Sequence, residues 1–128
     1  MKAVPYERDG VPRPAVTVRV RDPLRRSSAE VQTRVDTGFD GGLLIPLDQY
    51  VALGLQEYEE PGSAFVARST LGVVVSLRSS KGIATVEGKS SDCSVYTTPL
   101  VLRPLLGREL LNRWKVMLDG PKSVLEFH

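Results

Sequence analysis

The chain has 128 residues, and its 17 lysines and arginines against 15 aspartates and glutamates give a net charge of +2. With 41% hydrophobic and 25% charged residues it suits one folded domain over residues 1–128, which excludes wholesale disorder and a disulfide-dense mini-protein. No apolar run approaches the roughly 20 residues of a membrane helix, and residues 1–10 lack the apolar core of a signal peptide. Because one cysteine cannot form an internal disulfide, we expect a cytoplasmic protein without a membrane partner.

The residue inventory also limits the chemistry. His128, the last residue, is the only histidine, so catalysis that depends on a positioned imidazole is not expected. One cysteine, Cys93, and one terminal histidine cannot form a zinc site of the Cys/His type. The sequence carries neither a GxxxxGK[ST] nor a GxGxxG phosphate-binding pattern. We therefore expect no metal and no cofactor, and carboxylates, lysines and hydroxyls remain as reactive groups.

In the first half of the chain, apolar and polar residues alternate as in strands. Residues 15–21 alternate with period two, which predicts a strand with one wet face. An exposed basic loop then leads to a second predicted strand over 29–35. A short buried strand is expected over 43–46, and a short helix over 47–53.

The second half predicts a hairpin whose arms are 63–68 and 73–77 and whose tip, 69–72, contains a glycine. Its second arm continues toward residue 88. The other expected elements are an edge strand over 4–6, an extended run over 95–102, a helix over 107–114, and a closing hairpin of 116–118 and 123–127. The sum is a mostly β domain of short strands.

Asp36-Thr37-Gly38 places a carboxylate at the end of an apolar strand. Strand ends at tight turns present side chains to clefts, and a glycine lets backbone N–H groups approach the carboxylate. Taken alone, the motif is also compatible with a plain Asx-type turn. The glycines at 41 and 42 allow a third interpretation, the phosphate-binding turn of a sugar-kinase or actin-like fold, but that fold needs a much longer chain.

About 70 residues downstream, Pro104-Leu105-Leu106-Gly107-Arg108-Glu109-Leu110-Leu111 brings two apolar residues and a glycine to the start of a helix. The order of Asp-Thr-Gly, glycine-tipped hairpin and apolar-apolar-Gly resembles the retropepsin-like aspartic proteases. The run from Asp36 to Pro46 is similar to the small bacterial and archaeal members, and the resemblance covers residues 15–127. It implies an all-β closed barrel of short strands with a flap hairpin and one short C-terminal helix.

The resemblance also implies a role for individual residues. It assigns catalysis to Asp36, Thr37 and Gly38. It assigns substrate binding to Phe39, Asp40, Ser69, Thr70, Leu71, Gly72 and Leu105, with residues 69–72 as the tip of the flap. It assigns a structural role to Leu106, Gly107 and Arg108, with Arg108 and Asp40 forming a buried ion pair.

The implied activity is that of an aspartic endopeptidase, which hydrolyses a peptide or protein substrate. This chemistry needs two carboxylates that share a proton across one water. Since the chain has a single Asp-Thr-Gly, a homodimer would supply the second Asp36. The alternative is a non-catalytic peptide-binding or assembly module on the same fold.

Four arginines, at 19, 21, 25 and 26, lie on one predicted strand and the loop after it. They form either a solvated face or a nucleic-acid contact. Acidic residues elsewhere and few aromatic residues favour the solvated face, and we expect no nucleic-acid partner.

Overall fold

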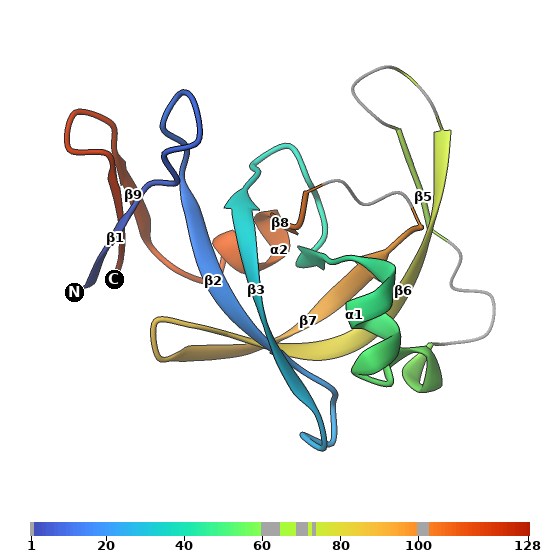
Figure 1. The fold of residues 1–128 in the computed structure, drawn as a ribbon. Helices are drawn as coiled ribbons and strands as arrows, with labels where there is room; N and C mark the ends of the chain where they lie inside the picture. The colour runs from blue at the N-terminus through green and yellow to red at the C-terminus, as the bar shows by residue number, and fades with distance from the viewer. Residues whose placement is uncertain (1, 60–64, 69–71, 73, 100–102) are drawn as a thin grey trace.

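The computed structural model of the chain describes residues 2–59, 65–68, 72, 74–99 and 103–128 (Figure 1). A closed barrel of six strands forms its centre. A separate three-stranded sheet contains the first and last strands of the chain. No helix in these described ranges is long and apolar enough to cross a membrane.

The barrel strands follow the neighbour order β2-β3-β8-β4-β7-β6, and pairing of β2 with β6 closes the ring. Their bounds are β2 Ala15–Arg21, β3 Ser28–Val35, β4 Leu43–Leu44, β6 Val74–Val86, β7 Lys89–Thr97 and β8 Leu105–Leu106. The closing contact is antiparallel and joins residues 19–21 to residues 83–85. The predicted all-β closed barrel is confirmed.

The alternation in β2 directs its valines inward. Val16, Val18 and Val20 are at most 1% exposed, while Thr17 and Arg19 face solvent. This is the wet-faced strand that the sequence predicts, with the predicted bounds. Each valine side chain that leaves water contributes about 1.5–3 kcal/mol to folding, so this face is a main part of the core.

Asp22 fixes the loop between β2 and β3. Its side chain is only 2% exposed. The backbone N–H of Ser27 donates to its Oδ1 at 2.7 Å, and the Tyr58 hydroxyl donates to its Oδ2 at 3.1 Å. A buried carboxylate needs such donors to replace water, so this end of the barrel is tied together by polar contacts.

The long strand β6 turns into β7 through Glu87 and Gly88, whose φ angles of 48° and 78° are both positive. Two positive φ values are the signature of a type I′ hairpin turn. Strand β7 begins six residues before the predicted run over 95–102 and ends at Thr97; residues 100–102 lie outside the described part. The prediction missed residues 89–94 because they are mostly polar and gain their strand conformation from pairing with β6.

Strand β5, Phe65–Arg68, pairs with the start of β6 and forms the predicted hairpin. In Figure 1 this hairpin rises on the same side of the barrel as the loop that follows β3. Helix α1, Leu47–Ala52, and the 3₁₀ helix η1, Leu55–Tyr58, pack near its base. Helix α1 confirms the short helix expected over 47–53, whereas η1 was not predicted, so the fold has helical segments besides the C-terminal helix.

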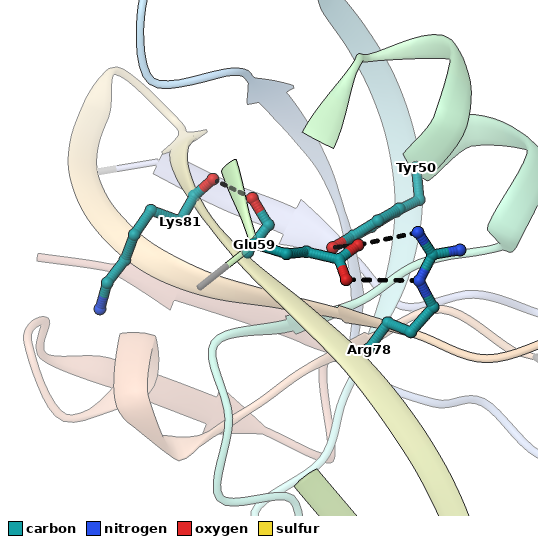
Figure 2. Close-up of polar contacts among 5 residues, drawn as sticks. Tyr50, Glu59, Arg78 and Lys81 are labelled. Carbon is teal, nitrogen blue, oxygen red and sulfur yellow. Dashed lines mark hydrogen bonds and ion pairs between the residues drawn. The ribbon is translucent and has the colours of Figure 1, made fainter. Parts of the chain in front are cut away.

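A polar network connects these helical segments to β6 (Figure 2). The buried Tyr50 hydroxyl donates to Glu59 Oε2 at 2.8 Å, and Arg78 Nη2 lies 2.9 Å from the same carboxylate oxygen. The Arg78 guanidinium also lies over the Tyr50 ring, 5.6 Å from its centre. Burial and the neighbouring carboxylate raise the pKa of Tyr50. The network anchors the base of the β5–β6 hairpin.

Helix α2 comprises only Arg108–Leu111, although the sequence predicts a helix over 107–114. Beyond Leu111, the N–H groups of Arg113 and Trp114 reach back three residues, so the segment continues as tight turns. Leu110, fully buried, anchors α2 in the core. Strand β8 was not predicted as a strand, because two residues are too short for an alternation signal.

The terminal sheet has the order β1-β10-β9. Its strands are β1 Lys2–Pro5, β9 Val116–Asp119 and β10 Val124–Phe127. The closing hairpin and an N-terminal strand were both expected from the sequence. Phe127 is buried against Trp114, with ring centres 6.2 Å apart in an edge-to-face arrangement. Trp114 thus packs against the core.

We predict that Asp22→Asn destabilises the protein at neutral pH but has a diminishing effect in acid. The Ser27 N–H and the Tyr58 hydroxyl hold the pKa of Asp22 below its ordinary value. A lowered folded-state pKa stabilises the protein fully above the unfolded value of about 3.9, and that stabilisation is lost as the pH falls through the folded value. Urea unfolding from pH 7 to pH 3 measures the difference in the free energy of unfolding between the variant and wild type. The exposed Asp92→Asn is the control, and a difference for Asp22→Asn that does not change with pH contradicts the prediction.

Candidate active site

Asp36 follows β3 directly, and a downstream segment positions it. Its backbone N–H donates to the carbonyl of Leu106 at 2.9 Å, next to the parallel pairing of β3 with β8. The N–H of Gly38 donates to Asp36 Oδ1 at 2.8 Å, so the carboxylate is oriented by its own turn. Asp36 is half-buried, while Thr37 and Gly38 are exposed. The carboxylate thus lies at the end of the barrel, on a loop whose surface is open.

Gly107 lies against the loop that carries Asp36. Its N–H donates to the carbonyl of Gly42 at 2.9 Å, and the N–H of Arg108 donates to the carbonyl of Phe39 at 2.8 Å. A Cβ at position 107 would overlap the Gly41 carbonyl and would lie 2.7 Å from the Phe39 carbonyl oxygen. Only glycine allows this close approach of two backbones.

The two leucines of β8 differ in exposure. Leu106 is fully buried in the barrel core, while Leu105 is half-buried. Strand β8 pairs with β3 on one side and with β4 on the other. The structure thus brings together the Asp36 loop and the 105–108 segment.

Arg108 and Asp40 form an ion pair, but it is not buried. Their side chains are 50% and 71% exposed in the single chain, so the expected burial is wrong for one chain. Exposed pairs of this kind contribute about 0–1 kcal/mol to stability. In the single chain the pair therefore does little to hold the loop, and the backbone hydrogen bonds carry that role.

Phe39 packs on an aromatic residue that sequence reasoning did not select. Its ring meets Tyr96 of β7 edge-to-face, with centres 5.7 Å apart. A Cβ at Gly41 would overlap both rings. The contact of Phe39 with Tyr96 thus ties the Asp36 loop to β7. The sequence carried no signal for Tyr96, because the pairing of β4 with β7 is what brings this residue to the site.

The predicted flap tip is described only at Gly72; Ser69, Thr70 and Leu71 lie outside the described residues. Gly72 is exposed and has a φ of 80°, the left-handed region that favours glycine. The arms below it pair in register, Ala67 with Val75 and Arg68 with Val74.

An ion pair between Arg34 and Glu7 was also missed. Arg34 Nη2 lies 2.7 Å from Glu7 Oε1, and the two side chains are only 15% and 22% exposed. The Arg34 hydrogen bond lowers the pKa of Glu7. Because 27 residues separate the partners, no local pattern predicts the pair.

Cys93 is only 3% exposed, and burial raises the pKa of its thiol to about 12. A thiol with such a pKa is a poor nucleophile at neutral pH. Within the described ranges, no group of three or more His, Cys, Asp or Glu residues is arranged to hold a metal ion.

We predict that Gly107→Ala destabilises the fold by about 1–3 kcal/mol, because the added methyl must displace the backbone of the Asp36 loop. Gly120→Ala is the matched control, since a Cβ there meets nothing within 4 Å. Urea unfolding midpoints compare the two variants. Equal midpoints would count against the close approach described above.

No protein-family model matches the chain, and no curated protein shows a significant sequence match. In contrast, 171 chains of solved structures match significantly. One is EIAV protease in complex with the inhibitor HBY-793, with a TM-score of 0.58 and 19% identity over 86% of this chain and 93% of that one. Another is a retropepsin-like aspartic protease from Rickettsia conorii, with a TM-score of 0.66 and 17% identity over 98% of this chain and 88% of that one. The chain therefore has the retropepsin-like fold.

Proposed function

We propose that this protein is an aspartic endopeptidase that acts on peptide or protein substrates as a homodimer. The observation that carries the proposal is the Asp36 loop, whose carboxylate is held by the Gly38 N–H on a loop hydrogen-bonded to residues 106–108. Both solved structures compared above are named as proteases and share the fold. Fold alone does not define function, so the proposal depends on this carboxylate.

The proposed hydrolysis needs two carboxylates, which is why we propose a dimer. One ionised aspartate activates a water, and a protonated partner donates to the substrate carbonyl oxygen. Each chain has one Asp-Thr-Gly, so the second carboxylate comes from a second copy. The exposure of Thr37 and Gly38 leaves this loop open to a partner.

The remaining roles are those that the resemblance to retropepsin-like proteases implies. We assign substrate contacts to the loop and strand residues Phe39, Asp40 and Leu105 and to the flap residues 69–72. Leu106, Gly107 and Arg108 position the loop. The proposed chemistry needs no metal or organic cofactor.

We predict that Asp36→Asn abolishes cleavage, because an amide cannot serve as the general base. Loss of general acid–base catalysis typically lowers the rate about 10²–10⁴-fold. Wild type and variant are incubated with a denatured protein mixture from acid to neutral pH, and the cuts are read by mass spectrometry. Asp48→Asn, at an exposed carboxylate of α1, is the control that keeps activity. Full binding of a peptide by Asp36→Asn, with no turnover by wild type at any pH, would favour the peptide-binding module instead.

We predict that Asp36→Asn also inhibits wild type when the two are mixed. If each active unit needs two Asp36 residues, random exchange of subunits in an equal mixture removes roughly half of the wild-type activity. Activity and sedimentation are followed over one dilution series, and specific activity falls as the dimer dissociates. Mixing with Asp48→Asn, as a control, does not lower the activity of the wild-type chains. A fully active monomer would refute the shared pair of carboxylates.

A further inference from the structure

The end of η1 contacts two regions of the fold that are far apart in sequence. The Tyr58 hydroxyl donates to Asp22 Oδ2 at 3.1 Å, in the loop between β2 and β3. The next residue, Glu59, accepts a hydrogen bond from the Tyr50 hydroxyl at 2.8 Å and pairs with Arg78 of β6 at 2.9 Å. Two adjacent residues are thus held on two sides, one by a loop of the barrel and the other by the base of the β5–β6 hairpin, which is the predicted flap.

Arg78 occupies the point at which the flap leaves the barrel. The residue before it, Leu77, pairs with Phe65, the first residue of β5. Arg78 itself pairs with Thr97 of β7, in the barrel wall. Its guanidinium approaches both carboxylate oxygens of Glu59, with Nε at 3.4 Å and Nη2 at 2.9 Å (Figure 2). The position of Glu59 therefore affects the position of the flap base.

The Asp22 side of this arrangement is a fixed point on the barrel. Asp22 is 2% exposed, and the Ser27 N–H also donates to its carboxylate at 2.7 Å. Burial and the Asp22 carboxylate raise the pKa of Tyr58, so the Tyr58 hydroxyl stays protonated and donates. Hydrogen bonds to an ionised carboxylate are stronger than those between neutral groups. Asp22 is thus a firm support for the end of η1.

The segment cannot hold Glu59 in place by its own backbone. Helix η1 has only four residues, Leu55–Tyr58, and 3₁₀ turns of this length have weak hydrogen-bond geometry. Leu55, which is fully buried, anchors only the start of the segment. The other end depends on the side-chain contacts of Tyr58 and Glu59. Loss of the Tyr58 contact therefore loosens Glu59, and Arg78 loses a fixed partner.

We propose that Asp22 and Tyr58 are positioning residues of the flap, although they lie at the end of β2 and β3 opposite to Asp36. Strand β3 has eight residues, so the two ends are separated by roughly 25 Å at about 3.3 Å per residue. The inference rests on the proposed protease function and adds a remote determinant of substrate binding. A displaced flap base weakens the contacts of the flap with substrate, whereas the Asp36 loop keeps its backbone partners. The effect is therefore expected on KM rather than on kcat.

The first test is Tyr58→Phe, which removes the hydroxyl and keeps the ring. The KM for a peptide that wild type cleaves is expected to rise about threefold with kcat unchanged, a part of what one lost hydrogen bond can cause. Amide hydrogen exchange should accelerate more in residues 74–78 of the free protein than in residues 16–20 of β2. A contact that only stabilises the fold would change neither KM nor this ratio of exchange rates, and either result would overturn the proposal.

A double-mutant cycle tests the connection through Glu59. Tyr58→Phe and Arg78→Gln act on the same segment, so their joint effect on KM is expected to be smaller than the product of the single effects. Arg19→Gln is the matched control, because Arg19 also pairs with a glutamate, Glu30, and its side chain is 48% exposed, like that of Arg78. Arg19→Gln should leave KM unchanged, alone and in combination with Tyr58→Phe. A full product for Tyr58→Phe with Arg78→Gln would refute the connection.

Hydrogen exchange separates a failure of this inference from a failure of the proposed function, because it requires no cleavage. If wild type cleaves no peptide, the protease function fails, and the same cycle is then read from the exchange of residues 74–78. Selectively faster exchange of these residues in Tyr58→Phe still supports the positioning role. Exchange that is unchanged there, or that rises equally in residues 16–20, refutes it.

Discussion

Backbone hydrogen bonds from residues 106–109 hold the loop that carries Asp36. They reach the N–H of Asp36 and the carbonyls of Phe39, Gly41 and Gly42, so the loop is fixed along most of its length. Each such bond contributes only about 1 kcal/mol net, but together they leave the loop few alternatives. The same short segment supplies β8, which joins β3 to β4 in the barrel wall. The same segment therefore links two strands of the barrel wall and positions the carboxylate.

The two ends of the β2–β3 pair are built differently. At the Asp22 end, a buried carboxylate is saturated with donors from its own loop and from η1. At the Asp36 end, Thr37 and Gly38 are open to solvent and the Asp36 carboxylate is only half-buried. Saturated polar groups stabilise a fold, whereas unsaturated ones are available for binding. The end of the barrel that holds Asp36 therefore has the character of a binding surface.

Sequence patterns predicted what depends on local alternation or on a motif. The valines of β2 gave the correct strand because their period is two, and Asp36-Thr37-Gly38 with the 105–107 segment gave the correct fold. The first half of β7 was missed because its polar residues are strand-forming only through pairing with β6. The Arg34–Glu7 contact was invisible because nothing local connects its partners. The predicted ion pair between Asp40 and Arg108 is present, but its predicted burial is wrong for a single chain, because burial depends on contacts that no local pattern shows.

The topology also constrains when the molecule can be completed during synthesis. Strand β1 is made long before β10, yet the two strands pair, with Lys2 opposite Phe127. The residues that hold the Asp36 loop likewise follow it in the sequence by about 70 residues. Contacts this distant in sequence form slowly, since a long loop must close before they bring any gain. On the ribosome, the nascent chain therefore carries its Asp-Thr-Gly without the backbone partners of residues 106–109, and the loop reaches its final geometry only once they have emerged.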